Sequence, residues 1–298
     1  MSHLVTVMGA TGNIGRALAD RLLKNGIKVR AVGRGHDKLA PLMQSGAEIR
    51  AGSLEDRAFT TDALRGANAA FLMIPPPYNV PDMRAEQRRI GASLIEAVKK
   101  SSIQRVVVLS SAGGELSAGT GPILALHEFE NAVRDIAGLS AVILRPTYFM
   151  ENHLGSIGLI KHAGINGSSM RPDTRLPMVA TRDISAVAAE ILSTPTFTGI
   201  SVREIPGPRD YSMQEATAIL GAAIGKPDLA YVQFSDGDFK KGLEGAGFSA
   251  NAADLFVEMN AAFNAGTIQT TARRSPANTT ATTLEQFARE VFAPAFQR

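Results

Sequence analysis

The 298-residue sequence contains no cysteine and no tryptophan. The absence of thiols excludes disulfides, thiolate metal sites and a cysteine nucleophile. No apolar run reaches the length of a membrane-spanning helix. The 31 basic and 28 acidic residues are well mixed, and no basic run of the kind that follows nucleic acid occurs. The sequence therefore predicts neither a membrane segment nor a nucleic-acid partner.

Two further absences concern location and metals. The N-terminus has no cationic segment followed by an apolar run and a cleavage site, so we expect a cytoplasmic protein. The histidines show no metal-ligand spacing, so we expect no metal site. With 45% hydrophobic and 20% charged residues, the chain is apolar enough to bury a sizeable core.

The most informative stretch is glycine-rich and lies near the N-terminus. A β-branched run, Leu4–Met8, leads into Gly9-Ala10-Thr11-Gly12-Asn13-Ile14-Gly15, and a helical pattern follows directly. In this context glycines let phosphate oxygens approach the main chain, and the helix N-terminus offers free N–H groups. The stretch predicts the pyrophosphate-binding turn of a dinucleotide site, with contacts from Gly9, Thr11, Gly12, Asn13, Ile14 and Gly15.

Short apolar runs alternate with amphipathic helical patterns up to about residue 145. We expect strands over 4–8, 27–32, 48–51, 69–74, 105–110 and 141–144, and helices over 13–25, 36–45, 56–65, 82–100 and 122–137. This rhythm implies right-handed βαβ crossovers. It predicts an α/β protein with a doubly wound, parallel Rossmann sheet, whose ligand lies beyond the carboxyl ends of the strands.

The rhythm changes after Pro146. Residues 146–180 look irregular, and 266–281 look like a long loop. Between and after them we expect helices over 183–193, 236–245, 249–265 and 283–293, a helix starting in a Ser212–Glu215 capping box, and strands over 201–205 and 229–234. We expect residues 1–150 to form the nucleotide-binding domain, with later segments able to return to it. Residues 151–298 then form a smaller α+β lobe for the substrate or for regulation.

The end of the second expected strand points to the kind of dinucleotide. No carboxylate stands at Gly33 to bind a ribose 2′-hydroxyl, and Arg34 and Lys38 follow it. A guanidinium suits a 2′-phosphate. We therefore predict NADP(H) rather than NAD; the alternative is a solvated basic loop.

Two further turns face the same edge of the sheet. Ser53 and Leu54 follow the third strand, where the adenine ring would lie, although the turn also reads as an ordinary helix cap. Ile74 and Pro75 end the fourth strand, where the ribose and nicotinamide would run. The triple proline that starts at Pro75 is equally an ordinary rigid loop.

Ser110 and Ser111 end the fifth strand, where short-chain dehydrogenases place a catalytic serine. The usual Tyr-x-x-x-Lys partner motif is missing. The four tyrosines and the residues four positions later are Tyr78 and Asp82, Tyr148 and Asn152, Tyr211 and Glu215, and Tyr231 and Ser235. The sequence therefore excludes the standard tyrosine-based proton transfer.

Several motifs together resemble the NmrA-like atypical short-chain dehydrogenases. They are the Gly9–Gly15 turn, the Arg34 loop, Val107–Ala112, Ala180–Ile184 and, most specifically, Leu144-Arg145-Pro146-Thr147-Tyr148-Phe149-Met150-Glu151-Asn152. The resemblance covers most of the chain and is strongest over residues 1–195. It implies a Rossmann domain with a small C-terminal substrate lobe, a preference for NADPH, and either quinone, azo-dye or triphenylmethane-dye reduction or NADPH sensing without turnover.

The resemblance also implies roles for individual positions. His127 occupies the place of the motif lysine, while Ile123 stands at the tyrosine and Asn131 where relatives often have glutamate. His127 would hold the nicotinamide ribose or deliver a proton, unless it is a satisfied helix histidine.

The candidate site residues fall into three groups. Candidate catalytic residues are Ser111, His127 and Tyr148. Further cofactor contacts are Ser110, His127, Pro146 and Tyr148. Candidate substrate contacts are Tyr78, Tyr148, Phe149, Met150 and Met170. The aromatic residues would wall a flat substrate, or they only seal the two lobes together.

Two functions follow from these features. The first is an NADPH-dependent reductase that transfers hydride to a flat, electron-poor small molecule, such as a quinone or azo compound. The alternative is a non-catalytic, NADP(H)-binding redox sensor that engages a protein partner.

Overall fold

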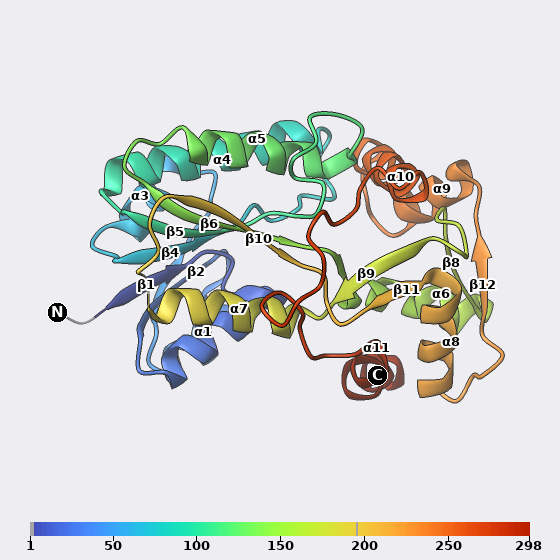
Figure 1. Ribbon diagram of the computed structural model, residues 1–298. Helices are drawn as coiled ribbons and strands as arrows, with labels where there is room; N and C mark the ends of the chain where they lie inside the picture. The colour runs from blue at the N-terminus through green and yellow to red at the C-terminus, as the bar shows by residue number, and fades with distance from the viewer. Residues whose placement is uncertain (1–2, 195) are drawn as a thin grey trace.

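The computed structural model describes residues 3–194 and 196–298 (Figure 1). Its centre is a seven-stranded parallel sheet in the order β10-β6-β5-β4-β1-β2-β3. The strands are β1 (Leu4–Val7), β2 (Lys28–Gly33), β3 (Glu48–Ala51), β4 (Ala69–Leu72), β5 (Arg105–Leu109), β6 (Ser140–Pro146) and β10 (Ile200–Ile205). This sheet confirms the predicted α/β Rossmann fold.

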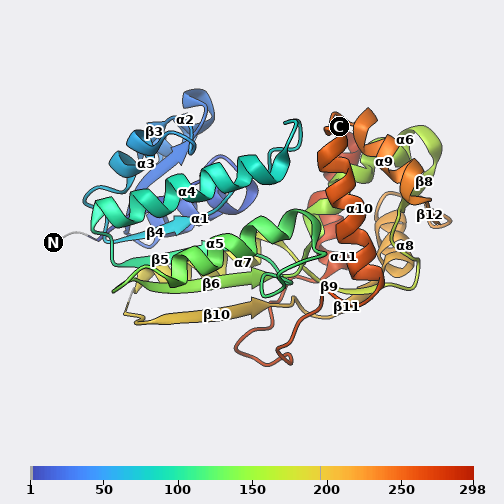
Figure 2. The ribbon, with the colours of Figure 1, turned by 90° about the horizontal axis from the view of Figure 1, so that it is seen from above.

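Helices cover both faces of the sheet (Figures 1 and 2). One face carries α1 (Asn13–Lys24), α2 (His36–Gln44) and α7 (Thr181–Ser193); the other carries α3 (Arg57–Leu64), α4 (Met83–Ser101) and α5 (Leu124–Arg134). Neighbouring strand residues therefore enter different cores: Val107 packs toward α1 and α7, and Val108 toward the α3–α5 face. Burial on both faces explains why the central strands β4, β5 and β6 are nearly continuous apolar runs.

A second lobe lies beyond the carboxyl ends of the strands (Figure 1). It contains a three-stranded sheet, β11-β9-β7, and a two-stranded sheet, β12-β8. Its elements are β7 (Tyr148–Phe149), η2 (Met150–Ser156), α6 (Ile157–Ala163), β8 (Ile165–Ser168), β9 (Arg175–Val179), β11 (Asp210–Ser212), α8 (Met213–Ala223), β12 (Ala230–Gln233), α9 (Asp236–Gly245), α10 (Ala250–Asn264), and the helical run α11 (Leu284–Phe287), η3 (Ala288–Phe292) and α12 (Ala293–Gln297). The predicted capping box is present, because Ser212 accepts from the Glu215 backbone N–H.

The expectation that residues 146–180 are irregular is wrong. This segment contains β7, η2, α6, β8 and β9. These elements are short, and β8 includes Asn166 and Gly167, which favour strands poorly. Pairing with β12, more than sixty residues later, stabilises β8, and no local pattern reveals that pairing.

Segments of the second half return to the first. Strand β10 extends the main sheet beside β6, and α7 packs on α1. The segment after α10 also runs back along β10 (Figure 2). There the Glu204 carboxylate accepts from the backbone N–H groups of Thr271 at 3.0 Å and Ala272 at 2.8 Å. Among the helices of the described residues, none combines the length and apolar character needed to cross a membrane.

Candidate cofactor and substrate cavity

A cavity of about 330 Å³ opens where the carboxyl ends of the strands face the second lobe. The predicted site residues that line it are Gly9, Gly12, Asn13, Ile14, Gly15, Ile74, Tyr78, Ser110, Ser111, Tyr148 and Phe149. The position agrees with the rule that open α/β sheets bind ligands beyond their carboxyl edge. One space therefore joins the glycine turn to the aromatic residues of the later chain.

Glycine occupies the three positions 9, 12 and 15 of the turn for different physical reasons. Gly9 has φ +68°, and a Cβ at Gly15 would collide with the Gly9 carbonyl oxygen, so the fold itself needs both. Gly12 has φ −89°, which any residue adopts, and the nearest atom to a Cβ there would be 3.5 Å away. Nothing inside the protein requires glycine at position 12. The missing side chain instead leaves cavity space open.

The N-terminus of α1 is left uncapped at the same place. Its N-cap is Gly12, no side chain accepts a hydrogen bond there, and the first turn contains no acidic residue. The first N–H groups of a helix have no partner within the helix, and its dipole favours an anion. The turn is therefore suited to bind a phosphate group.

Two cationic side chains, Arg34 and Lys38, follow β2 next to this turn. A Cβ at Gly33 would lie 2.8 Å from the Thr11 side chain, so the end of β2 packs closely against the glycine turn. Thr11 itself is not on the cavity wall. Arg34 and Lys38 are exposed, and neither forms an ion pair within the described part of the chain. Their charges remain available to an anionic group next to Gly12.

The other predicted cofactor contacts are less directly placed. Ser53 accepts from the Glu55 N–H at 3.2 Å, Leu54 is buried in the core, and neither lines the cavity. The helix cap is provided by Asp56, which accepts from Ala58 and Phe59. Ile74 lines the cavity, whereas Pro75 and Pro146 do not.

His127 does not reach the cavity. Its Nδ1 lies 2.9 Å from the Gly114 carbonyl oxygen, and its Nε2 lies 3.0 Å from Asn131 Nδ2. Both ring nitrogens therefore already have hydrogen-bond partners within the protein, one from the main chain and one from the next turn of α5. The structure therefore favours a satisfied helix histidine over a proton donor.

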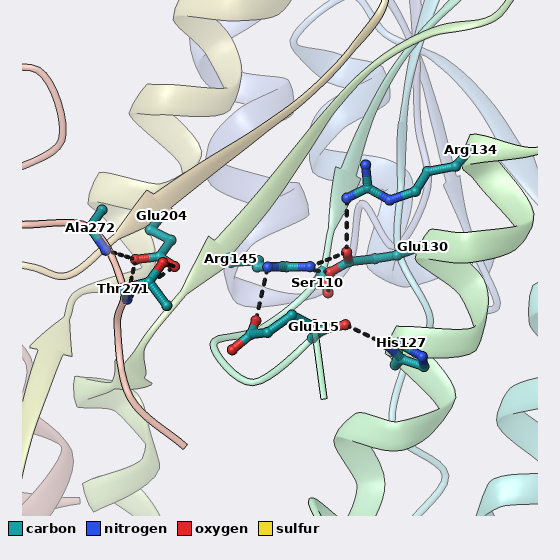
Figure 3. A network of polar contacts seen from close by, with 10 residues as sticks. Ser110, Glu115, His127, Glu130, Arg134, Arg145, Glu204, Thr271 and Ala272 are labelled. Carbon is teal, nitrogen blue, oxygen red and sulfur yellow. Dashed lines mark hydrogen bonds and ion pairs between the residues drawn. The ribbon is translucent and has the colours of Figure 1, made fainter. Parts of the chain in front are cut away.

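A buried ion network lies next to His127 (Figure 3). Glu130, only 1% exposed, accepts from Arg145 at 2.9 and 2.6 Å and from the Ser110 hydroxyl at 2.5 Å. Arg145 also donates to Glu115 at 2.8 Å. Burial lowers the pKa of Arg145, but the hydrogen bonds and charge of Glu130 outweigh this, and the net shift is upward. The Ser110 hydroxyl is therefore committed to the network, while Ser111 remains on the cavity wall.

The Glu130–Arg145 ion pair was not predicted from the sequence. Arg145 stands in the most specific motif, and Glu130 interrupts the apolar stripe of α5 between Leu126 and Val133. A glutamate on the buried face of a helix is a signal that a cation pairs with it. The same motif contains Glu151, whose carboxylate accepts from the Thr181 N–H and hydroxyl and so caps α7.

The aromatic candidates divide into two groups. Tyr148 and Phe149 line the cavity. The rings of Tyr148 and Phe263 pack edge to face, with their centroids 6.4 Å apart. Burial raises the pKa of the Tyr148 phenol well above its ordinary value, so its hydroxyl stays protonated. Met150 and Met170 are 0% and 2% exposed and pack in the core of the second lobe. They do not touch the cavity, and the prediction that they contact substrate is not supported.

Helix α10 closes the cavity with residues that the sequence analysis did not identify. Phe256, Met259 and Phe263 lie on one face of the helix and line the cavity. The centroid of the Tyr78 ring lies 4.6 Å from that of Phe248 and 5.8 Å from that of Phe256, and both ring pairs are tilted. The three-, four- and seven-residue spacing was a visible signal, but helical spacing alone does not distinguish a cavity wall from a core.

Comparisons with known proteins agree with this architecture. The sequence profile of the NmrA-like family matches residues 1–288. The chain is 33% identical over 226 residues, 75% of either chain, to the (4-alkanoyl-5-oxo-2,5-dihydrofuran-3-yl)methyl phosphate reductase of Streptomyces griseus. It is 28% identical to the uncharacterized oxidoreductase YesF of Bacillus subtilis, with 88% of this chain and 85% of YesF covered.

Solved structures show the same fold. The Escherichia coli NADPH-dependent quinone oxidoreductase, solved with NADPH, superposes with a TM-score of 0.81 at 22% identity over 97% of this chain and 99% of its own. The Citrobacter sp. triphenylmethane reductase, solved with NADP(H), gives 0.81 at 19% identity over 96% and 99%. The negative transcriptional regulator NmrA gives 0.73 at 16% over 99% and 97%. The predicted resemblance is confirmed: the chain belongs to the NmrA-like family.

Proposed function

We propose that this protein is an NADPH-dependent reductase that transfers a hydride to a flat, electron-poor acceptor such as a quinone or azo compound. One observation carries the proposal: a single cavity joins an uncapped, glycine-lined helix N-terminus to an aromatic chamber. The names of the relatives support it, since the Streptomyces protein is a reductase and two of the similar structures are NADPH-dependent or NADP(H)-bound reductases.

The residues at the glycine end fit a dinucleotide phosphate. Gly12 leaves room for the pyrophosphate, and the α1 N–H groups donate to it. Arg34 and Lys38 provide the positive charge that a 2′-phosphate requires, and no carboxylate is at Gly33 to repel it. When bound, the cofactor supplies the hydride.

The residues at the aromatic end bind and orient the acceptor. Tyr148, Phe149 and Phe263 offer flat apolar contacts and exclude water from the reacting face. Quinone, NADPH and one proton give hydroquinone and NADP+, so one proton enters for each hydride. Ser111 and Tyr148 present the cavity hydroxyls that can donate a hydrogen bond to the charge developing on the acceptor. Solvent supplies the proton, because both ring nitrogens of His127 are occupied.

Both ring nitrogens of His127 already have hydrogen-bond partners within the protein. This observation favours a second candidate function, an NADP(H)-binding sensor without turnover. The experiment that separates the two mixes the protein with NADPH and a panel of quinones and azo dyes under anaerobic conditions. The reductase proposal predicts acceptor-dependent loss of NADPH absorbance in wild type and none in Gly12→Val. Cofactor-dependent thermal stabilisation without NADPH loss on any acceptor contradicts the reductase proposal and leaves the sensor.

A further inference from the structure

Helix α10 presents an apolar face to the cavity. Phe256, Met259 and Phe263 lie on one side of the helix, and each of them is partly exposed and lines the cavity. Seven residues span about 10 Å along a helix, so this face is longer than a single aromatic ring. The opposite side of α10 packs on α9, where Asp254 pairs with Lys240 at 2.5 Å. The three apolar side chains are therefore turned toward the cavity and away from α9.

Aromatic contacts extend this face at both ends. At one end the ring of Phe263 packs against that of Tyr148, which lines the cavity beside the glycine turn. At the other end the ring of Phe256 lies 5.8 Å from that of Tyr78, which is 40% exposed and so reaches the surface of the protein. We call Tyr78, Phe256, Met259 and Phe263 the apolar wall. It leads from Tyr148 inside the cavity to the surface.

Contacts with α4 and with the segment before α5 fix the position of α10. Arg84 of α4 pairs with Glu258 of α10 at 2.9 Å and donates to the Gly121 carbonyl oxygen at 3.0 Å. Gly121 lies so close to α10 that a Cβ at this position would collide with the Leu255 carbonyl oxygen. A ligand that packs on the apolar wall therefore meets a surface that is already held in place, which lowers the entropy cost of binding.

The cavity offers a ligand no charged partner. Within residues 3–194 and 196–298, no Asp, Glu, Lys, Arg or His side chain lines it. Charged groups of the neighbouring elements pair with each other instead, Arg84 with Glu258 and Arg145 with Glu130. An anionic group on the ligand would lose its water without gaining a cation, and the faces of the aromatic rings carry partial negative charge. The apolar wall therefore favours an uncharged ligand.

We propose that the acceptor is a neutral quinone with an apolar side chain, and that this side chain packs on the apolar wall. The inference rests on the proposed reductase function and names its substrate class. When the quinone ring lies beside Tyr148, its side chain extends along α10 toward Tyr78 and the surface. Each methylene that is fully buried in this way strengthens binding about fourfold.

The test varies the side chain and keeps the ring. Wild type is assayed with 1,4-naphthoquinones that carry methyl, propyl or 3-methylbutyl at position 2, since these alkyl groups have similar electronic effects on the ring. From methyl to 3-methylbutyl, kcat/KM should rise by at least about tenfold. Phe256→Ala and Met259→Ala should lose most of this rise without a change in the NADPH Kd. Met43→Ala, at an exposed methionine of α2 outside the cavity, should keep it.

A charged analogue tests the preference for a neutral acceptor. A 2-carboxyethyl group has the shape of 3-methylbutyl but carries a negative charge, so wild type should turn this quinone over at least about tenfold less efficiently than the 3-methylbutyl compound. Met259→Lys places a cation on the apolar wall and should raise the ratio of carboxyethyl to 3-methylbutyl kcat/KM by about tenfold. Ala261→Lys adds the same charge at an exposed position of α10 outside the cavity and should leave the ratio unchanged.

The outcomes are separable. Equal kcat/KM for the three alkyl quinones in wild type would overturn the packing of a side chain on the apolar wall. An undiminished rise in both alanine variants, with circular dichroism like that of wild type, would overturn it as well. Equal turnover of the carboxyethyl and 3-methylbutyl compounds would contradict a neutral acceptor. Failure of every quinone in wild type, with NADPH bound, refutes the reductase function on which this inference rests.

Discussion

Replacing Arg145 with methionine should destabilise the protein strongly, although Arg145 lies outside the cavity wall. The substitution leaves the Glu130 carboxylate, 1% exposed, with only the Ser110 hydroxyl and a longer contact to Arg134 at 3.5 Å. Removing one partner of a buried ion pair costs about 3–5 kcal/mol, because the remaining charge is neither hydrated nor paired. A chain of 298 residues unfolds with an entropy of roughly 0.6 kcal/mol/K, so the melting temperature should fall by about 5–8 °C.

The assay is thermal and urea unfolding followed by circular dichroism. Arg88→Met is the matched control, because Arg88 also pairs bidentately with a glutamate but is 53% exposed, and its loss should cost no more than about 1 kcal/mol. The double variant Arg145→Met with Glu130→Leu should recover much of the loss, since no charge is then stranded. If Arg145→Met lowers the free energy of unfolding by no more than Arg88→Met does, the conclusion that water is excluded from the Glu130–Arg145 pair is refuted.

Three further predictions concern the cavity and its surroundings. Gly12→Ala should keep the wild-type melting temperature but lose NADPH affinity, whereas Gly15→Ala should have a lower melting temperature because its Cβ meets the Gly9 carbonyl. Calorimetry measures the melting temperature and fluorescence titration the affinity. If Gly12 served only the fold, Gly12→Ala would have a lower melting temperature and unchanged NADPH affinity. Arg34→Ala should weaken NADPH binding by about 1.5–3 kcal/mol and leave NADH binding unchanged, and equal losses for both cofactors would reject a 2′-phosphate contact. Burial lowers the pKa of His153 to about 4, below the 6.5 of an unfolded histidine. As the pH falls, the unfolded chain therefore binds this proton before the folded chain does. The free energy of unfolding of the wild type should fall by up to roughly 3 kcal/mol between pH 6.5 and pH 4. His153→Phe should flatten that dependence in urea titrations at each pH, and an unchanged slope would contradict the buried neutral ring.

The parts that the sequence predicted well are local. The strand, glycine turn and helix from Leu4 to Lys24 follow one another directly, so neighbouring residues determine their geometry. The same holds for the Ser212 cap and for the alternation that produces the sheet. The cationic Arg34 beside the glycine turn follows from strand order alone, since β1 and β2 are adjacent.

The parts that it did not predict depend on contacts between distant residues. Tyr78 meets Phe256 of α10, and Arg84 meets Glu258, across more than 170 positions. His127 shows why a motif position is insufficient: its role follows from the Gly114 carbonyl and Asn131, which occupy both ring nitrogens. Met150 lies next to two cavity residues in sequence but points into the lobe core.

Hydride transfer from NADPH to a quinone in the cavity can be observed directly. Stopped-flow mixing of the NADPH-loaded protein with 2-methyl-1,4-naphthoquinone, without oxygen, measures it in a single turnover. We expect the absorbance of the reduced nicotinamide to fall. The fall should be slower for one of the two stereospecifically 4-deuterated cofactors, because the cavity presents one face of the ring to the acceptor. Binding of NADPH followed by no absorbance change on quinone addition would contradict it.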